Sequence, residues 1–316
     1  MSLTFSLYLK QNSNPSEKSR LPLEDIYLEG ENGSTVILVH GLTGTPNEMK
    51  FLAGYLNKQG YSVICPRLAF HGGPLPILKK AKWQNFYESV RQAMMRVQGS
   101  AKHGHIFVGG LCMGALLTLL LAEEFQNKIS GVSCLAPTFF YDGWNMPWYR
   151  HLLPLAYLTP LKHFFYFKED FPYGVKNEAI RARIHKYYRD ARLDNIEGVA
   201  ELGYPYLPVV LLYEHHLLAK NLIKRFPLIQ VPVQLIQAKD DDTTSIKNSE
   251  LVLHRIGSAV KEMVLLEDSY HVITVDQERH VVAKKMADFF SRFRTTKTKM
   301  SLAGDFKHEP SRSEFR

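Results

Sequence analysis

Residues 105–117 have the sequence HIFVGGLCMGALL, from which the fold class can be predicted. Residues 105–108 are apolar after the leading histidine, as expected of a strand that helices cover on both faces of a parallel sheet. From Met113 onward the residues are apolar and favour a helix. The pair Gly109-Gly110 is predicted to form the turn between the two elements. The stretch therefore predicts a buried strand, a sharp turn that carries Cys112, and a buried helix.

The same alternation continues on both sides of this stretch. Continuous apolar runs predict strands at residues 35–39 and 61–65, and apolar residues at helical spacing predict helices at 47–59 and 83–97. Short strands that alternate with helices of about ten residues or more form parallel pairs, so the chain is predicted to be an α/β protein with a doubly wound, mostly parallel sheet. The elements predicted farther along are strands at 132–135, 231–237 and 261–266 and a closing amphipathic helix at 276–293.

The alternation of strands and helices is interrupted by a segment rich in proline and aromatic residues. We interpret this segment as an inserted helical cap at residues 137–226. The core of the fold is then assigned to residues 22–136 and 227–294. A polar N-terminal segment covers residues 1–21. Residues 295–316 are polar, charged and non-periodic, and they are predicted to be a disordered basic tail.

Composition narrows the class of protein. A chain of 316 residues that is 45% hydrophobic can bury a full core. The first twenty residues lack the apolar region of a secretory signal, and no apolar run approaches the roughly 20 residues that span a bilayer, so a soluble protein is predicted. Cys65, Cys112 and Cys134 are an odd number of cysteines in a large chain, which favours free thiols in a reducing compartment and hence a cytoplasmic location.

The chain is basic, with 39 Lys and Arg against 31 Asp and Glu, for a formal net charge of +8. Such a charge favours an anionic partner. Nucleic acid is not predicted, because no nucleic-acid-binding motif is present. The cluster Arg181, Arg183, Lys186 and Arg189 is interpreted as a solvated helix face, and the alternative is a weak, reversible contact of cap and tail with a membrane surface.

The pentapeptide Gly110-Leu111-Cys112-Met113-Gly114 has the pattern of a nucleophile elbow, G-x-S-x-G, with cysteine at its centre. The pattern needs small flanking residues because strand and helix approach closely there, and Gly110 and Gly114 satisfy it. The positive end of the following helix favours a thiolate. The alternative is a buried cysteine that only fills space.

A nucleophile of this kind needs a base and an orienting acid, in the chain order nucleophile, acid, histidine. The predicted strand at 231–237 is followed by three consecutive aspartates at 240–242, and spacing alone leaves the choice among them open. His271 follows the next predicted strand and is the candidate base. His40 and His71 lie beside glycines and are interpreted as residues that shape loops.

Acyl transfer also requires hydrogen-bond donors for the developing oxyanion, usually two backbone N–H groups. Met113 directly follows the candidate nucleophile. Leu42 lies in the loop after the predicted strand at 35–39. These two amides are the predicted oxyanion hole.

On these motifs the chain resembles the bacterial carboxylesterase and monoacylglycerol lipase family of α/β-hydrolases, over residues 35–293. Residues 39–46 look like the family's oxyanion loop and residues 269–274 like its histidine loop. The resemblance implies that Asp241 is the acid. Two departures stand out, since Cys112 occupies the family's serine position and Tyr270 a position that is commonly glycine. At the motif level, cysteine in this place also resembles dienelactone hydrolases and polyhydroxyalkanoate synthases.

The predicted function is hydrolysis of a carboxylic ester of small to medium acyl chain through an acyl-enzyme on Cys112, without a metal or an organic cofactor. One alternative is acyl transfer from the thioester to an amine, alcohol or thiol. Another is a hydrolase-fold scaffold that has lost activity and binds a ligand. Trp144, Trp148 and Phe165 of the cap are predicted either to line the substrate pocket or to pack in the cap itself.

Overall fold

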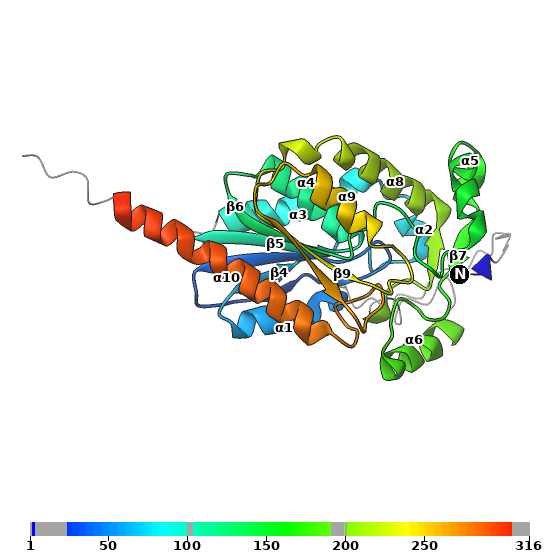
Figure 1. Ribbon diagram of the computed structural model, residues 1–316. Helices are drawn as coiled ribbons and strands as arrows, with labels where there is room; N and C mark the ends of the chain where they lie inside the picture. Colours follow the sequence, from blue (N-terminus) through cyan, green and yellow to red (C-terminus); the bar gives the residue numbers. More distant parts are fainter. Residues whose placement is uncertain (1, 4–23, 100–103, 191–198, 200, 305–316) are drawn as a thin grey trace, which may run out of the picture.

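The computed structural model describes residues 2–3, 24–99, 104–190, 199 and 201–304 of the chain. Within these residues, a mostly parallel sheet lies at the centre, with helices on both faces (Figure 1). None of the described helices has the length and hydropathy needed to cross a bilayer.

The described part of the central sheet has seven strands in the order β10-β9-β6-β5-β3-β4-β2. Every neighbouring pair is parallel except β2 and β4. This mostly parallel, doubly wound sheet is the α/β-hydrolase fold that the sequence predicted. The strands are β2 (Ile26–Leu28), β3 (Ser34–Val39), β4 (Ser62–Cys65), β5 (His105–Leu111), β6 (Ile129–Leu135), β9 (Val233–Ala238) and β10 (Lys261–Leu266).

Helices cover the two faces of this sheet (Figure 1). On one face lie α1 (Lys50–Lys58), preceded by the short helix η1 (Pro46–Met49), and α10 (Arg279–Gly304), which packs against α1. The other face carries α3 (Trp83–Gln98), α4 (Met113–Glu124), α8 (Val209–Ile223) and α9 (Lys247–Arg255). Helix α4 is buried from Met113 to Ala122, since it packs between the sheet and the outer helices α3 and α8.

The described residues between β6 and α8 lie at the carboxyl ends of the strands (Figure 1). Their strands, β7 and β8, pair with the N-terminal β1 in an antiparallel sheet of the order β1-β7-β8. Helix α8 falls inside the range assigned to the cap but packs against α3 and α4. The described elements between β6 and α8 are η2 (Trp148–Leu152), α5 (Leu153–Tyr157), η3 (Pro160–His163), β7 (Tyr166–Lys168), α6 (Glu178–Asp190) and β8 (Tyr206–Pro208). Elsewhere in the described chain lie β1 (Ser2–Leu3), α2 (Leu75–Leu78) and η4 (Phe226–Leu228).

The predicted turn at Gly109-Gly110 is wrong, because β5 continues through both glycines to Leu111. The glycines serve packing instead. A Cβ on Gly109 would lie 2.9 Å from the Met286 side chain of α10, and a Cβ on Gly110 would lie 2.3 Å from the Gly114 backbone. The turn is therefore displaced by two residues and falls on Cys112 itself.

The C-terminal helix also differs from the prediction. Helix α10 begins at Arg279 and continues to Gly304, beyond the predicted end at residue 293. The predicted tail at 295–316 therefore begins as helix, and no proline interrupts the chain before Gly304. Residues 305–316 lie outside the described part of the chain. Helix α9, between β9 and β10, was not predicted.

Candidate active site

The backbone of Cys112 carries the sharp turn between β5 and α4. Its φ of 57° and ψ of −117° belong to a region that residues with side chains rarely adopt. A Cβ at Gly114 would lie 2.2 Å from the carbonyl oxygen of Val39, so only glycine fits beside the nucleophile. The strain holds the Cys112 side chain at the carboxyl end of the sheet, where it lines a cavity and is 8% exposed.

The other cysteines lie in a different setting. Cys65 in β4 and Cys134 in β6 are fully buried and unpaired. Burial raises the pKa of both thiols above the ordinary value. These two are therefore inert packing residues, and Cys112 is the cysteine that reaches the cavity.

A carboxylate and an imidazole meet beside this turn. The Nδ1 atom of His271 lies 2.9 Å from Asp241 Oδ2 and 3.1 Å from Oδ1. Asp241 also accepts hydrogen bonds from Gln237 Nε2 at 2.8 Å and from the backbone N–H groups of Thr243 and Thr244 at 2.9 and 2.8 Å. A carboxylate with this many donors is fixed in orientation and stabilised in its charged form.

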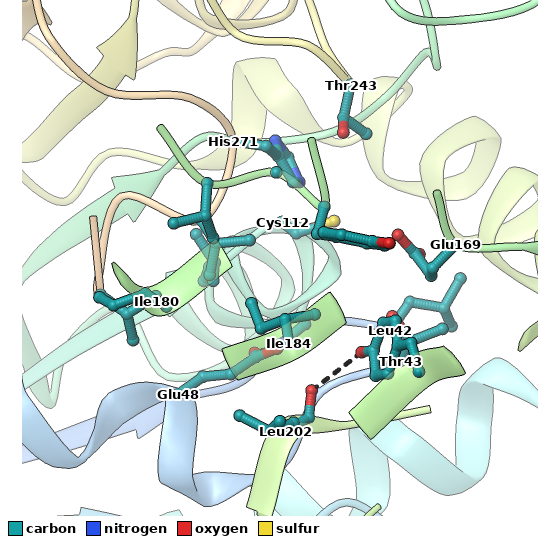
Figure 2. Close-up of a pocket in the computed structure, with 18 of the residues that line it drawn as sticks. Leu42, Thr43, Glu48, Cys112, Glu169, Ile180, Ile184, Leu202, Thr243 and His271 are labelled. Carbon is teal, nitrogen blue, oxygen red and sulfur yellow. Dashed lines mark hydrogen bonds between the residues drawn. The ribbon is translucent and has the colours of Figure 1, made fainter. Parts of the chain in front are cut away.

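The second ring nitrogen of His271 is directed to the cavity. It is buried, and the described residues provide no hydrogen-bond partner for it. Burial alone lowers the pKa of His271, but the Asp241 carboxylate and the nearby Cys112 raise it to well above its usual value. Figure 2 shows His271 and Cys112 side by side at the top of the cavity. The structure therefore brings the His271 ring and the Cys112 side chain to the same cavity.

The structure distinguishes the three consecutive aspartates. Asp241 alone of the three is bonded to the His271 ring. Asp242 contacts the backbone N–H of His271 at 3.4 Å and that of Gly174 at 3.2 Å, and burial together with the adjacent Asp241 raises its pKa to about 6. The Asp240 side chain is exposed and lies 3.8 Å from Lys176. Only Asp241 is positioned to orient the imidazole.

The predicted oxyanion loop lies against the same cavity. Leu42 lines it, and Met113 begins α4 directly after Cys112. The N–H groups of a first helical turn have no acceptor within the helix, so the Met113 amide is suited to bind an anion. Buried His71 holds the loop in place, since its Nε2 donates to the Leu42 carbonyl at 2.8 Å. His40 Nε2 accepts the backbone N–H of Leu68 at 3.2 Å. Both histidines shape loops, as predicted.

Sequence reasoning missed Glu48, which braces this loop. Its Oε2 accepts the N–H of Gly41 at 3.0 Å, and a Cβ on Gly44 would lie 2.1 Å from the carboxylate. Burial raises the pKa of Glu48 to about 7, although the Gly41 N–H and His271 lower it. The only signal in the sequence was an acidic residue directly after the loop, at the start of the next helix, where acidic residues are common.

The cavity in front of Cys112 has a volume of about 280 Å³ (Figure 2). Its walls combine apolar side chains, among them Ile180, Ile184 and Leu202, with three carboxyl groups, those of Glu48, Glu169 and Glu201. The aromatic residues that face it are Tyr141, Tyr173 and Tyr188. Among the described residues, no group of three or more His, Cys, Asp or Glu side chains is arranged to hold a metal ion.

The three aromatic residues predicted for this pocket do not line the cavity. Trp148 lies on the outer surface and is 76% exposed. Phe165 packs against the main core, and Trp144 donates its indole N–H to the Asp240 carbonyl at 2.9 Å. The aromatic side chains that line the cavity are instead those of tyrosines. Their hydroxyl groups suit a wall that also contains carboxyl groups.

The histidine loop is tied to the start of α6 by Asp276, which is fully buried. Its carboxylate accepts the backbone N–H groups of Lys176, Asn177, Tyr270 and Gln277 at 2.7 to 2.9 Å. Asp276→Asn would turn an amide N–H₂ toward these donors. We expect it to lower the free energy of unfolding by about 1–3 kcal/mol in urea titrations.

The matched control is Asp268→Asn on the same loop. Asp268 is exposed and pairs with Lys176 Nζ at 2.9 Å, and such surface pairs contribute less than about 1 kcal/mol. Equal losses in the two variants would show that the buried carboxylate does not hold the loop.

Glu169 gives the fold a dependence on pH. Burial, with the nearby Asp242 carboxylate, raises its pKa to about 7, against an ordinary value of 4.5. Between these two values the folded chain holds a proton that the unfolded chain releases, so this group lowers the free energy of unfolding as the pH rises. We expect Glu169→Gln to raise the melting temperature relative to the wild type more at pH 8 than at pH 5. Glu178→Gln, whose side chain is 91% exposed, should show the same difference at both pH values.

Comparison with solved structures places the fold among lipolytic enzymes. A structure described with the metagenome-derived lipolytic enzymes LipS and LipT superposes with a TM-score of 0.69 and 25% identity, covering 85% of this chain and 98% of the other. The monoacylglycerol lipase of Paleococcus ferrophilus superposes with a TM-score of 0.67 and 16% identity, with the same coverage.

Sequence relatives agree with this result. A thermostable monoacylglycerol lipase of Bacillus sp. strain H-257 is 27% identical over 264 residues, which span 83% of this chain and 92% of the relative. A carboxylesterase of Bacillus subtilis strain 168 is 22% identical over 257 residues, 81% and 92% of the two chains. The family Hydrolase_4, described as serine aminopeptidase S33, matches residues 30–278, and the chain belongs to this family.

Proposed function

We propose that the chain hydrolyses carboxylic esters through a thioester intermediate on Cys112, with His271 as base and Asp241 as orienting acid. The observation that carries this proposal is the pairing of His271 with Asp241 in the wall of the cavity that Cys112 also lines. The relatives named as monoacylglycerol lipase and carboxylesterase support the ester as the substrate class.

The proposed reaction has two halves. In the first, the Cys112 thiolate attacks the ester carbonyl, and the N–H groups of Leu42 and Met113 stabilise the oxyanion. The C–O bond to the alcohol breaks as His271 Nε2 gives its proton to the leaving oxygen. In the second half, His271 takes a proton from water and the hydroxide attacks the thioester carbonyl. The C–S bond then breaks, which regenerates the Cys112 thiolate and releases the carboxylic acid. Asp241 holds the imidazole in one orientation throughout.

The cavity supports a substrate of limited size with one apolar and one polar part. Its volume of about 280 Å³ accommodates a small to medium acyl chain. Ile180, Ile184 and Leu202 provide apolar contacts, and Glu48 and Glu169 offer hydrogen bonds to hydroxyl groups. A monoester of a short polyol fits this combination.

The cysteine favours acyl transfer as a second candidate function. A thioester reacts with amines and thiols more readily than an oxygen ester does, so an acceptor other than water can take the acyl group. The two functions share the first half-reaction and differ in the second. Chromatography of the products, with glycerol, a primary amine or a thiol present, separates them: free acid in every case supports hydrolysis, and an acylated acceptor supports transfer.

The test of the proposal is intact-mass spectrometry during reaction with p-nitrophenyl esters of graded acyl length. We expect the mass of one acyl group on the enzyme, located at Cys112 by peptide mapping, followed by its loss as the ester is consumed. A chain that neither gains this mass nor releases p-nitrophenol with any acyl length would contradict the proposal and favour the non-enzymatic alternative.

A further inference from the structure

Asp242 lies where the histidine loop meets the segment that precedes α6. Its Oδ1 accepts the backbone N–H of His271 at 3.4 Å, and its Oδ2 accepts that of Gly174 at 3.2 Å. The Thr243 hydroxyl donates to Oδ1 at 3.5 Å. Asp242 is not among the residues that line the cavity in front of Cys112. One buried carboxylate behind the cavity therefore joins two segments that are distant in the sequence.

The segment that carries Gly174 follows the histidine loop closely, and we call residues 173–177 the strap. The Gly174 carbonyl accepts the backbone N–H of Val272 at 2.8 Å. Two further N–H groups of the strap donate to the Asp276 carboxylate, each at 2.8 Å. A Cβ on Gly174, whose φ is 70°, would lie 2.8 Å from the Val272 side chain and 3.4 Å from the Cβ of His271. The strap is thus in direct contact with the backbone of the proposed base.

The strap leads into α6, and the inner side of this helix forms a wall of the cavity. Ile180, Ile184 and Tyr188 of α6 line the cavity that His271 also lines. Figure 2 shows Ile180 and Ile184 below His271. A group that fixes the strap against the histidine loop therefore also fixes the imidazole relative to this wall.

The backbone of Asp242 is held independently of the strap. Its carbonyl accepts the N–H of Asn145 at 3.1 Å, and the Thr243 carbonyl accepts that of Gly143 at 3.0 Å. A Cβ on Gly143 would lie 2.4 Å from the carbonyl carbon of Asp242, so the two backbones are in close contact. The carboxylate consequently extends from an anchored backbone toward the two N–H groups that it joins.

Asp242 is not explained by the stability of the fold. Burial, followed by the adjacent Asp241, raises its pKa from an ordinary value of 3.8 to about 6. Between these values the folded chain holds a proton that the unfolded chain releases, so the group lowers the free energy of unfolding as the pH rises. Its hydrogen bonds are also longer than the bonds of 2.7 to 2.9 Å that Asp276 accepts. A buried charge that costs stability beside a reactive group indicates a role in function.

We propose that Asp242 is a positioning residue, which holds His271 in place for Cys112 by joining the histidine loop to the strap. This inference rests on the proposed function, because it assigns a role within the same reaction. Since Asp242 does not line the cavity, its effect reaches the substrate through His271. A displacement of about 1 Å in a reacting group can lower a rate by roughly 100-fold.

Asp242→Asn tests the proposal, because the amide keeps the shape of the side chain but turns an N–H₂ group toward one of the two donors. We expect kcat for a p-nitrophenyl ester to fall by about 10- to 100-fold, while KM changes by less than about twofold. Alkylation of Cys112 by iodoacetamide should become slower. The melting temperature at pH 8 should equal or exceed that of the wild type, since a buried charge is removed.

The matched control is Asp240→Asn, the same change at a neighbouring side chain that is 64% exposed. This variant should resemble the wild type in turnover, alkylation and melting temperature. Wild-type turnover and alkylation in Asp242→Asn would refute the proposal. A loss of turnover that Asp242→Asn shows only together with a lower melting temperature would make Asp242 a residue of the fold instead.

Gly174→Ala disturbs the same contact without the removal of a charge. The added Cβ presses on the side chain of Val272, which should displace the histidine loop from the strap. We expect kcat to fall by about tenfold or more in this variant as well. If Gly174→Ala keeps the wild-type kcat and Asp242→Asn does not, the effect comes from the charge of Asp242, and the positioning role is wrong.

Acylation of the wild type measures the proposed function separately. A wild-type chain that forms no acyl-enzyme would contradict the ester reaction. The rate of Cys112 alkylation in Asp242→Asn, compared with the wild type and with Asp240→Asn, would then still decide whether Asp242 positions His271.

Discussion

Cys112→Ala is expected to abolish both the covalent intermediate and ester turnover. The methyl group keeps the strained turn between β5 and α4 but has no atom that can attack a carbonyl. Removal of a nucleophile from a triad lowers kcat by roughly 10⁴-fold or more, because only oxyanion stabilisation and substrate binding remain. Intact-mass spectra with a p-nitrophenyl ester should show no added acyl group, and p-nitrophenol release should fall to the background rate.

The control for this variant is Cys134→Ala. Cys134 is buried in β6 without contact to the cavity, and its thiol is inert. The variant should still gain one acyl group at Cys112. Acylation that persists in Cys112→Ala and disappears in Cys134→Ala would overturn the assignment of the nucleophile.

Cys112→Ser separates the chemistry of sulfur from the shape of the site. Serine occupies this position in the family that the chain resembles, and the hydroxyl is smaller than the thiol. If the oxyanion amides and His271 are placed as in a serine esterase, the variant should retain hydrolysis of simple esters. A variant that is folded but inactive would indicate a site shaped for sulfur and would favour acyl transfer.

The central sheet could be predicted from the sequence because parallel strands are buried on both faces, and such strands appear in the sequence as nearly continuous runs of apolar residues. Residues 34–39 and 105–111 are examples. The position of the turn could not be predicted in the same way. Gly109 and Gly110 indicate a turn by their type, but they are glycines because Met286 and Gly114 approach them from other elements. The sequence around residue 109 carries no information about a contact with residue 286, so this contact could not be predicted.

The candidate nucleophile and histidine were predicted from chain order and motif spacing, which left the choice among residues 240–242 open, and the family resemblance implied Asp241 as the acid. The walls of the cavity were not predicted. Tyr141 and Glu169 lie outside the described helices and strands, where no period marks them, and Tyr188 lies on α6, whose helical pattern does not show that it faces the cavity. Because Trp148 is aromatic, it was a candidate for the substrate pocket. Its exposure shows instead that apolar side chains of this segment also face solvent.

The buried carboxyl groups have a common consequence for the site. Glu48, Glu169 and Asp242 all have a raised pKa, and burial is the largest cause in each case. His271 compensates in part, since its positive charge lowers all three values. The pKa of His271 itself is raised by Asp241 and Cys112, against the effect of burial.

Asp241→Asn tests how much of this stabilisation depends on one carboxylate. The amide removes the negative charge beside His271 Nδ1, and its N–H₂ group would face either the donor Gln237 Nε2 or the donor Thr244 N–H, according to which oxygen it replaces. Burial then dominates the pKa of His271 and lowers it, which disfavours the protonated imidazole that the proposed mechanism needs. We expect kcat to fall on the order of 10⁴-fold, as when a triad acid is replaced by its amide.

The rate of Cys112 alkylation by iodoacetamide against pH gives a second measurement. The proposed pairing of Cys112 with a protonated His271 should make alkylation faster in the wild type than in Asp241→Asn. Asp240→Asn is the control, because the Asp240 side chain is exposed and lies near Lys176, without a hydrogen bond to His271. Identical labelling profiles in all three proteins would mean that the Asp241 carboxylate does not control the charge of the pair, and the proposed roles of Cys112 and His271 would then need another source of activation.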